Sequence, residues 1–511
     1  MKKINIGFVG GLLRFIIVAV MIIAQIALVI GLVGTLRNSA VWAYALIDIA
    51  LVATMIALVS RNQNSSYTIA WISLIALLPL VGYVLYMMWG RSDTNGKRNK
   101  RIKKSLAYGE QFLKTESSAY EKLAEENPSC KRISRYLERQ GFPVYENTSC
   151  TYYPLGEQHF DALIEDLRRA KKFIFIETFI LSEGEVWDRL EKVLLEKEAE
   201  GVEIRLMYDD LGSLLTFPLV NGVSLRRQGI QVVRYNPIHK YTRGLSINYR
   251  NHQKTTVIDG NIAYTGGTNL ADEYANLYPK HGHWKDTAIR LEGDAAWSMT
   301  VIFLQMWDGE VDTSSDYAAY RPTVSKEATG FFQPFADGPV NNPSNPAEDV
   351  YRQMISGAQS TLYLTSPYFV VDNTMLDLLC AAAASGVDVR LVTPKIWDHW
   401  FVRMVSRSYY QMLLSAGVRI YEYTPGFIHA KMILADDKRC VMGSINLDYR
   451  SFYHHFENGV WICQADVLDD IGKDFSSIFE QSEEITMEWV KNIPLLTRFF
   501  GGVLRLFAVL F

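Results

Sequence analysis

Two stretches of the sequence share one pattern and decide the fold: His252-Gln253-Lys254-Thr255-Thr256-Val257-Ile258-Asp259 and His429-Ala430-Lys431-Met432-Ile433-Leu434-Ala435-Asp436. In each stretch a Lys follows the His by two positions and an Asp follows the Lys by five. Six further residues lead to a small-residue turn that closes on Asn, which is Gly266-Gly267-Thr268-Asn269 in the first copy and Gly443-Ser444-Ile445-Asn446 in the second. Two copies with the same spacing indicate one site assembled from both halves of the chain.

The repeated residue types suit phosphodiester chemistry. Side chains two positions apart in an extended segment share a face, so each copy presents an imidazole and an ammonium group together. A phosphodiester is anionic and has a poor alcohol leaving group, so its cleavage needs a nucleophile, fixed positive charge and an acid. His252, His429, Lys254 and Lys431 supply this set without a metal or another cofactor, because imidazole titrates near neutral pH.

The turns and the Asp residues have different expected roles. Gly267 and Ser444 let the backbone approach a phosphate closely, and Asn269 and Asn446 lie where a helix N-terminus could add donors, so we predict that these four bind or support the phosphate. The last members of the two motifs, Asp259 and Asp436, are expected at the tips of hairpins between apolar strands.

The paired motifs resemble the HKD motifs of the phospholipase D superfamily, whose active site takes one motif from each half of the chain. The resemblance implies that the His, Lys and Asp of both motifs form the catalytic set, with Asp259 and Asp436 mainly structural. It also implies that His252 is the nucleophile and His429 the acid and base, although the near symmetry of the halves leaves these roles exchangeable.

The resemblance further implies an acid that orients each imidazole and opens a later strand in each half. These acids map onto Asp286 and Glu457, which follow the motif His of the same half by 34 and 28 residues. A surface ion pair or a strand-start carboxylate is the alternative for both. The remaining candidates for a metal site, His281 with His283 and His454 with His455, have no nearby Cys or carboxylate set that completes four ligands, so we expect most of them at loops or at the rim, and no metal.

Similarity between the halves extends beyond the motifs. Residues 173–180 correspond to 361–369, residues 201–206 to 386–391, and residues 229–237 to 417–425. Each half therefore reads as strand, helix, strand, helix, strand and motif hairpin. This order predicts an α/β fold of two similar phospholipase D-like lobes, mixed β-sheets flanked by helices, that form one site.

The halves differ just before the motif His. His429 follows Pro425 by four positions, whereas His252 follows Pro237 by fifteen. The extra stretch, residues 239–250, is basic and aromatic, which suits an anionic headgroup at a membrane surface and equally an ordinary solvated loop.

Composition narrows the partners and the compartment. The 511 residues carry a net charge of −3, which argues against a nucleic-acid partner bound by a broad basic face. The five cysteines form no CxxC motif, and Cys380 and Cys440 lie in apolar runs. We expect those two to be reduced core residues, consistent with a domain that faces the cytosol.

The N-terminal region is predicted to be an α-helical membrane anchor with two or three transmembrane helices. Residues 15–36 carry no charge, residues 41–59 are apolar except for Asp48, and residues 67–89 are uncharged with Tyr and Trp at both ends. The last two segments resemble the two-helix anchor of bacterial cardiolipin synthases. Residues 15–36 are a span, an interfacial helix or a signal-like start, and Asp48 is expected near an interface rather than in a functional role.

Basic residues set the predicted orientation. The segment behind the last span contains one acid, Asp93, and seven basic residues: Arg91, Lys97, Arg98, Lys100, Arg101, Lys103 and Lys104. The positive-inside rule then places the lobes in the cytoplasm. The cluster would also attract anionic lipid, or serve as a topology signal alone.

At the other end, residues 493–511 are apolar apart from Thr497, Arg498 and Arg505, which favours an interfacial helix over one docked on the core.

Together these features predict five segments: a membrane anchor (1–92), a basic cytoplasmic linker or helix (93–130), a first lobe (131–325), a second lobe (326–490) and an amphipathic membrane-associating end (491–511). The resemblance to bacterial cardiolipin synthases implies a multi-pass plasma-membrane enzyme that converts two phosphatidylglycerol molecules to cardiolipin and glycerol through a phosphatidyl-histidine. A membrane-bound phospholipase D or a phosphatidyltransferase with another alcohol acceptor is the alternative, and a homo-oligomer is left open.

Overall fold

The computed structural model describes residues 23, 27, 41–60, 64–90, 96–114, 118–237, 249–341 and 344–510. These residues belong to two compact units. The larger unit comprises residues 94–236 and 249–504, and the smaller comprises residues 1–93, 237–248 and 505–511. Most of the apolar segment 15–36 and of the basic aromatic loop 239–250 lies outside the described residues.

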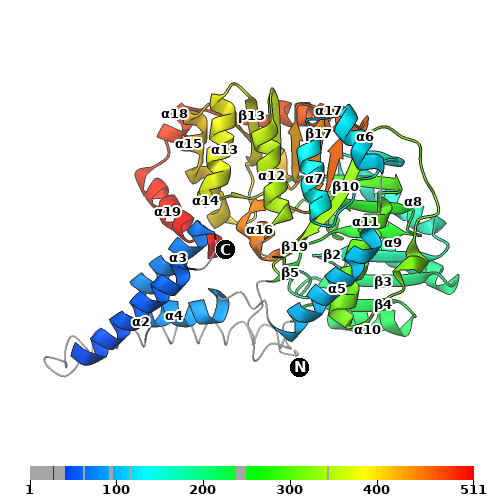
Figure 1. Ribbon diagram of the computed structural model, residues 1–511, viewed down its shortest axis with the longest axis horizontal. Coiled ribbons are helices and arrows are strands. Elements are labelled where there is room, and N and C mark those ends of the chain that lie inside the picture. The colour runs from blue at the N-terminus through cyan, green and yellow to red at the C-terminus, as the bar shows by residue number, and fades with distance from the viewer. Residues whose placement is uncertain are drawn as a thin grey trace. The chain divides into compact units, whose positions relative to one another are not determined.

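The first half of the larger unit is built on a seven-stranded sheet of order β1-β9-β7-β6-β2-β3-β4 (Figure 1). Its elements are β1 (Thr148–Tyr153), α8 (Gly156–Arg169), β2 (Phe173–Thr178), α9 (Glu185–Ala199), β3 (Glu203–Asp209), α10 (Leu219–Arg227), β4 (Gln231–Tyr235), β5 (Arg250–Asn251), β6 (Thr255–Ile258), β7 (Ile262–Gly266), β8 (His283–Lys285), β9 (Ala288–Gly293) and α11 (Ala296–Val311), with short 3-10 helices at Asp272–Ala275 and Tyr317–Tyr320. Strands β2, β3 and β4 are parallel, and β6 joins β2 antiparallel.

The second half has a nine-stranded sheet of order β10-β19-β17-β16-β11-β13-β14-β20, to which β5 adds at β19. Its elements are β10 (Phe331–Asp337), α12 (Pro346–Gly357), β11 (Thr361–Thr365), β12 (Phe369–Val370), α13 (Asn373–Ala384), β13 (Asp388–Pro394), α14 (Trp400–Ser408), α15 (Tyr410–Ser415), β14 (Arg419–Tyr423), β15 (Gly426–Ile428), β16 (Met432–Ala435), β17 (Arg439–Gly443), β18 (Leu447–Asp448), α16 (Tyr449–Tyr453), β19 (His455–Cys463), α17 (Val467–Glu480), β20 (Ser482–Ile485), α18 (Met487–Lys491) and α19 (Leu495–Leu506). The two sheets thus confirm the mixed α/β, two-lobed prediction.

The two halves share a hydrophobic core. Helix α11 is buried from Ala296 to Gly309. Its side chains join one buried cluster with Phe175 of β2 in the first half and with Val460 of β19 in the second. Because this helix has no polar face to solvate, it has to lie between other elements, and the two lobes pack as one compact unit.

The basic segment after the predicted anchor is also part of the larger unit. Helix α5 (Lys97–Leu113) packs along α11, and α6 (Ser118–Glu126) and α7 (Lys131–Arg139) follow it. Arg98 forms an ion pair with Glu310 of α11, with 2.8 Å between Nε and Oε2. Lys97, Lys100, Lys103 and Lys104 remain exposed. The cluster is therefore divided between residues that hold α5 in place and residues that face solvent.

The motif Asp residues occupy hairpin turns, as expected from the sequence. Asp259 lies between β6 and β7 at φ 53°, and Asp436 lies between β16 and β17 at φ 56°. The Asp259 carboxylate accepts hydrogen bonds from the backbone N–H groups of residues 171, 172 and 173 at 2.7–3.0 Å. Asp436 does the same for residues 359–361. Each Asp therefore ties its hairpin to the start of a neighbouring strand.

Residues 67–89 do not form one continuous helix. The chain forms α3 (Ser65–Leu77), then α4 (Pro79–Leu85) and a π-helical turn at Tyr86–Gly90. Pro79 ends the first helix because its ring clashes with the preceding turn and it has no N–H to donate. A Cβ on Gly82 would lie 2.6 Å from the carbonyl oxygen of Leu74, so glycine permits the close return of α4 onto α3.

Residues 41–59 form α2 (Val41–Val59), and its described side chains include the exposed Ile49, Val52, Ile56 and Val59. None of the helices in the described ranges combines the length and the apolar character needed to cross a membrane. The multi-pass anchor therefore stays a prediction.

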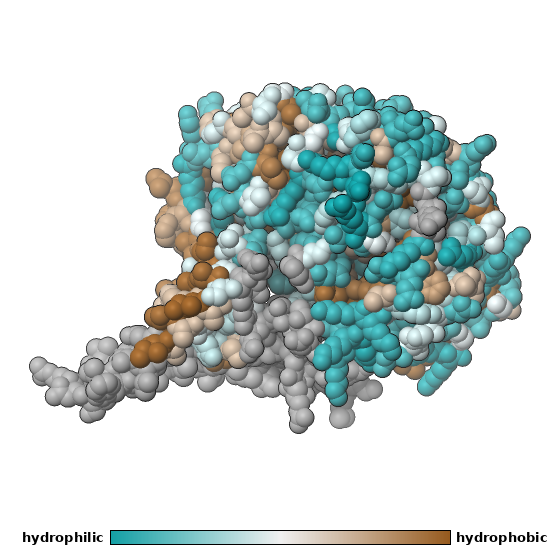
Figure 2. All heavy atoms as spheres, viewed as in Figure 1, coloured by the Kyte–Doolittle hydropathy of each residue, from teal (hydrophilic) through white to brown (hydrophobic). Residues whose placement is uncertain are grey.

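The C-terminal helix α19 is largely exposed. Leu495, Leu496, Phe499 and Phe500 are 55–83% exposed, and Figure 2 shows hydrophobic residues gathered at the edge of the molecule where Figure 1 labels α19. Gly501 is its buried position, and a Cβ there would lie 3.4 Å from the carbonyl oxygen of Met404 on α14. The helix thus docks through Gly501 and leaves an apolar face uncovered within the described chain.

One covalent link was not anticipated. Cys130 and Cys463 form a disulfide across 333 residues, while Cys150, Cys380 and Cys440 are free. Cys440 is buried as expected, but Cys380 is only partly buried. Because disulfides are typical of oxidising compartments, the cysteines give no support to the prediction of a reducing one.

Candidate active site

The first motif is held by the second half of the chain. Strand β5 belongs to the first half of the chain but pairs in parallel with β19 of the second half, with Arg250 opposite His455 and Asn251 opposite Phe456. The backbone N–H of His252 then donates to the carbonyl of Phe456 at 2.9 Å. His252 therefore enters the site beside a strand of the other lobe.

The second motif repeats this arrangement in the opposite direction. Strand β15 pairs in parallel with β8 of the first half, and the backbone N–H of His429 donates to the carbonyl of Lys285 at 2.7 Å. The two exchanges bring both motif histidines to one place. Both imidazoles are buried, with 6% exposure for His252 and 5% for His429.

The orienting acids are exchanged between the halves, which corrects the pairing expected from the sequence. His252 Nδ1 lies 2.9 Å from both carboxylate oxygens of Glu457. His429 Nδ1 lies 2.6 Å from Asp286 Oδ2. Each acid thus serves the motif of the other half, because β5 and β15 carry their histidines across to the strands that bear the acids. With Nδ1 occupied, Nε2 is the ring nitrogen left for a substrate.

The two lysines place positive charge beside the imidazoles. Lys254 and Lys431 are 4% and 1% exposed, and each Nζ donates to the backbone carbonyl of its own motif His at 2.5 Å. Lys431 Nζ also lies 2.9 Å from His429 Nδ1. Burial holds the pKa of Lys254 well below its usual range and lowers the pKa of Lys431 to about 8, against the opposing effect of Asp286 and Glu457.

Burial also sets the charge of the histidines. The pKa of His252 lies well below its usual value, first because the ring is buried. The nearby charges of Lys254, Lys431 and His429 lower it further. Burial and Lys431 lower the pKa of His429 to about 4, although Asp286 works in the opposite direction. Both imidazoles are therefore neutral at pH 7. A bound anion would raise these pKa values and favour protonation of one ring.

The second turn residue of each motif contacts an acid in the structure. A Cβ on Gly267 would lie 2.1 Å from Asp286 Oδ1, so only glycine leaves room for this carboxylate. At the equivalent position, Ser444 Oγ donates to Glu457 Oε2 at 2.5 Å. Ser451 Oγ donates to the other oxygen at 2.7 Å. Gly267 and Ser444 thus support the orienting acids, and their predicted contact with phosphate stays a prediction.

The two motif asparagines differ. Asn269 accepts from the backbone N–H of Ile180 at 3.0 Å and donates to the Tyr274 hydroxyl at 2.7 Å. Asn446 is equally buried, but its Oδ1 has no hydrogen-bond partner among the described residues. Asn269 therefore braces the end of β2, whereas the side-chain oxygen of Asn446 is left without a partner in the described part of the chain.

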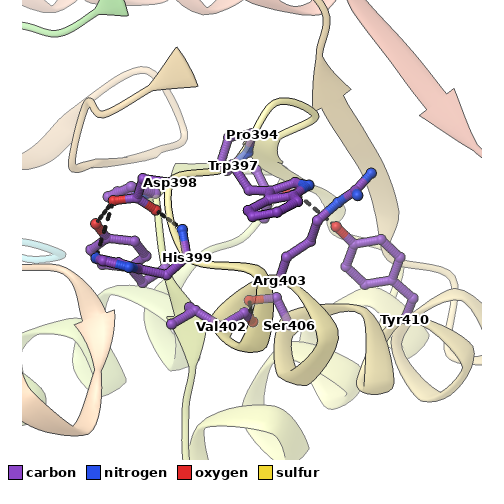
Figure 3. A pocket seen from close by; sticks show the side chains of 11 residues that line it. Pro394, Trp397, Asp398, His399, Val402, Arg403, Ser406 and Tyr410 are labelled. Atoms are coloured by element: carbon purple, nitrogen blue, oxygen red, sulfur yellow. Dashed lines mark hydrogen bonds and ion pairs between the residues drawn. The ribbon is translucent and has the colours of Figure 1, made fainter. Parts of the chain in front are cut away.

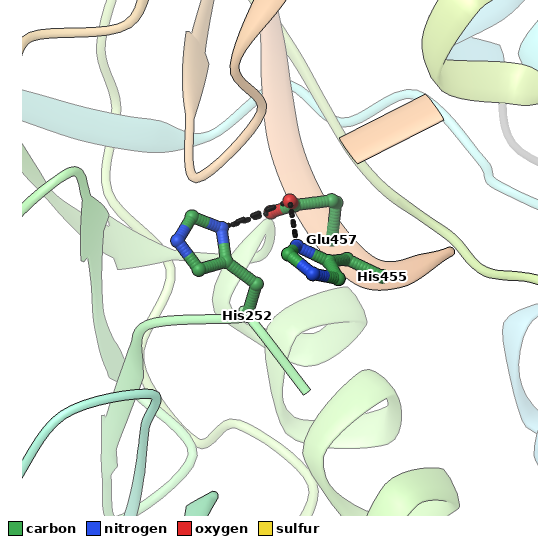
Figure 4. A group of neighbouring side chains, drawn as sticks. All are labelled: His252, His455 and Glu457. Carbon is green, nitrogen blue, oxygen red and sulfur yellow. Dashed lines mark hydrogen bonds and ion pairs between the residues drawn. The ribbon is translucent and has the colours of Figure 1, made fainter. Parts of the chain in front are cut away.

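His455 was expected at a loop or rim and is instead buried beside the first motif. Its ring centroid lies 5.3 Å from that of His252, and its Nδ1 lies 3.6 Å from Glu457 Oε1 (Figure 4). Trp284 occupies the equivalent position, two residues before Asp286, and lies 5.5 Å from His429. In the sequence, the signal for this neighbour was the residue two positions before each acid. It is His in one half and Trp in the other, so the two halves differ beside the motif histidines.

His252, His455 and Glu457 bring three ligand atoms within 4.8 Å of one another, a spacing that a metal ion could use. The carboxylate of Glu457 already accepts from His252, Ser444 and Ser451. A metal at this place would break the bonds that orient His252. The arrangement suits an organic acid–base site better than a metal centre.

Comparisons with known proteins identify the family. Residues 163–283 and 351–479 match the family model described as cardiolipin synthase, PLD-like domain, and residues 40–91 match that described as phospholipase D-nuclease N-terminal. The chain is 37% identical over 467 residues to an uncharacterized protein of Streptococcus mutans serotype c, covering 90% of this chain and 100% of the relative. It is 33% identical over 491 residues to a cardiolipin synthase of Geobacillus kaustophilus, covering 94% of each.

The crystal structure of phosphatidylserine synthase from Haemophilus influenzae Rd KW20 has the same fold, with a TM-score of 0.59 at 15% identity over 75% of this chain and 100% of the other. Two α/β lobes that each bring one His-x-Lys motif to a common site define a phospholipase D-like protein. The matches over nearly the whole chain place it more narrowly: the chain belongs to the cardiolipin synthase family.

The exchange of acids makes a spectroscopic prediction. We expect Asp286→Asn to perturb the ring resonances of His429 and to leave those of His252 close to their original positions, and Glu457→Gln to do the reverse. The measurement is ¹⁵N-histidine NMR in detergent, with signals assigned from His252→Gln and His429→Gln. Each acid variant should also lose roughly 10²- to 10⁴-fold in kcat. If Asp286→Asn perturbed the ring resonances of His252 instead, each acid would orient the histidine of its own half.

The lowered pKa of Lys431 makes a prediction about pH. Its charged form is present below pH about 8 and is lost as the pH rises through that value. We therefore expect kcat/KM for a phosphodiester substrate to fall above about pH 8, roughly tenfold per unit for a single essential proton. Rates at constant ionic strength would test this, and a profile that stays flat to pH 10 would show that the charge of Lys431 is dispensable.

Proposed function

We propose that this protein is a cardiolipin synthase that transfers a phosphatidyl group from one phosphatidylglycerol to a second, releasing glycerol. The observation that carries the proposal is the pair of buried His–acid couples, exchanged between the lobes, with two buried lysines beside them. This set supplies a nucleophile, an acid and fixed positive charge in one site, in a chain of the cardiolipin synthase family.

In the first step, Nε2 of His252 attacks the phosphorus of the donor lipid. A P–N bond forms, the P–O bond to glycerol breaks, and His429 in its protonated form gives its proton to the departing alkoxide. Lys254 and Lys431 offset the charge on the phosphate oxygens, and Glu457 stabilises the charge that develops on the His252 ring. The product is a phosphatidyl-histidine and free glycerol.

In the second step, His429, now neutral, accepts the proton of a hydroxyl on the second phosphatidylglycerol. That oxygen attacks phosphorus, the P–N bond to His252 breaks, and cardiolipin forms. His429 is again protonated and His252 neutral, so the cycle closes without a further reactant. Water can replace the lipid hydroxyl and would give phosphatidic acid, so the acceptor alone separates a synthase from a lipase.

The substrate requires that the site reach a bilayer. We place the protein in the bacterial plasma membrane, with the N-terminal helices as a multi-pass anchor and the lobes on the cytoplasmic side. Support comes from the exposed apolar side chains of α2, the exposed lysines of α5 and the apolar face of α19. That face would lie in the headgroup region and hold the site at the depth of its substrate.

The activity is tested by incubating the purified full-length protein with labelled phosphatidylglycerol in mixed micelles. We expect cardiolipin and glycerol in equal amounts, with the same rate in the presence of a chelator, because the lysines supply the positive charge that a metal would otherwise bring. Phosphatidic acid as the sole lipid product would contradict the proposal. The variant His252→Gln controls for a contaminating activity.

The membrane role of α19 is tested at its exposed face. We expect Phe499→Ser to reduce turnover on phosphatidylglycerol vesicles by roughly tenfold or more and to leave turnover in mixed micelles within about twofold, because a buried Phe contributes about 1.5–3 kcal/mol. Val311→Ser, at an exposed position on α11, is the matched control. Equal losses on vesicles and micelles would assign Phe499 to packing within the protein.

A further inference from the structure

A pocket on the second lobe lies at the edge of the sheet that carries the second motif. Its lining includes Tyr368, beyond the end of β11, and Thr393 and Pro394, at the end of β13. Met432, just after motif residue Lys431, pairs with Thr365 at the end of β11, so the motif lies at this same edge. The ends of neighbouring parallel strands are a common place for ligands in α/β sheets.

Contacts connect the pocket with the His429 side of the site. Tyr368 donates a hydrogen bond to Asp398, and both line the pocket. Tyr368 also packs against the apolar cluster that contains Tyr274 and Trp284. The ring centroids of Tyr274 and Trp284 lie 5.4 and 5.5 Å from that of His429. The pocket therefore adjoins the imidazole that would handle the protons of the alcohols.

The pocket contains an arginine with no carboxylate of its own in the described chain. Arg403 lies one turn before Arg407 on α14, and the carboxylate of Glu422 is taken by Arg407 at 2.5 and 2.8 Å and by the Tyr410 hydroxyl at 3.2 Å. The Nε of Arg403 is buried without a hydrogen-bond partner among the described residues. Burial and the neighbouring Arg407 lower the pKa of Arg403, against the opposing effect of Glu422.

Polar groups of opposite character lie at the two ends of the pocket. Figure 3 shows Asp398 and His399 at one end, Arg403 and Tyr410 at the other, and the indole of Trp397 between them. Ile396, Trp397 and Trp400 beside the pocket are 39–55% exposed. Tryptophan is typical of membrane interfaces, because its ring is apolar and its N–H is polar. The pocket thus combines a guanidinium group, hydrogen-bond acceptors and an apolar border.

The proposed reaction needs such a site. The hydroxyl of the acceptor lipid must take the place beside His429 that glycerol has left. The acceptor's own phosphate is then one glycerol unit further away, and Lys254 and Lys431 are already engaged with the phosphate of the intermediate. A second positive group has to lie outside the catalytic set, on the His429 side, to bind this second phosphate.

We propose that the pocket around Arg403 binds the headgroup of the acceptor phosphatidylglycerol, with its phosphate at the Arg403 guanidinium and its glycerol hydroxyls towards Asp398. This assignment rests on the proposed synthase activity and deepens it. In the step it serves, the acceptor oxygen forms the new P–O bond, the P–N bond to His252 breaks, and the hydroxyl proton passes to His429. The pocket decides whether a lipid or water completes the reaction.

The test is the partition of the intermediate between lipid and water. Full-length Arg403→Gln is compared with the wild type on labelled phosphatidylglycerol in mixed micelles, and both the first-turnover release of glycerol and the ratio of cardiolipin to phosphatidic acid are measured. We expect glycerol release to be unchanged and the ratio to fall about tenfold or more, the effect of losing a charge-assisted hydrogen bond. Lys491→Gln, an exposed position that loses the same charge, should keep the wild-type ratio.

Arg403→Lys keeps the charge without the planar fork, and we expect a ratio between those of the wild type and Arg403→Gln. Its melting temperature and that of Arg403→Gln report whether either variant fails to fold. A wild-type ratio in Arg403→Gln, or an equal loss of glycerol release and of cardiolipin, would overturn the acceptor site. A wild type that yields phosphatidic acid alone would overturn the proposed function first, and the acceptor site with it.

Discussion

Each motif histidine depends on a carboxylate from the other half of the chain. Neither half contains a complete His–acid couple, because Glu457 orients His252 and Asp286 orients His429. The short pairings of β5 with β19 and of β15 with β8 hold this exchange in place. The shared core around α11 keeps the two lobes together. If the lobes separated, both imidazoles would lose their orientation together.

Burial of this assembly explains its electrostatics. Two imidazoles, two ammonium groups and two carboxylates lie within a few side chains of one another at 0–6% exposure. Such a cluster is tolerated because each carboxylate has several donors and each lysine donates to a backbone carbonyl. Desolvation then holds both histidines neutral and lowers the pKa of both lysines. A bound anion would oppose these shifts, because it favours the charged forms.

The two halves are similar in strand order but differ where chemistry needs a difference. His455 packs against His252, whereas Trp284 packs against His429. The pocket around Arg403 belongs to the second lobe. In the proposed reaction, one side of the site first releases glycerol and then takes up the acceptor lipid. An asymmetric site of this kind suits such an exchange.

The sequence by itself determined the two motifs, the hairpins with Asp259 and Asp436 at their turns, and the α/β character of both halves. These features depend on alternation and turn residues within about ten positions, so local pattern is enough. Only the tertiary structure decided which acid serves which histidine, that Gly267 and Ser444 contact those acids, that His455 is buried, and that Cys130 meets Cys463. Each of these depends on pairing between segments far apart in the chain, and spacing along the sequence carries no information about such pairing.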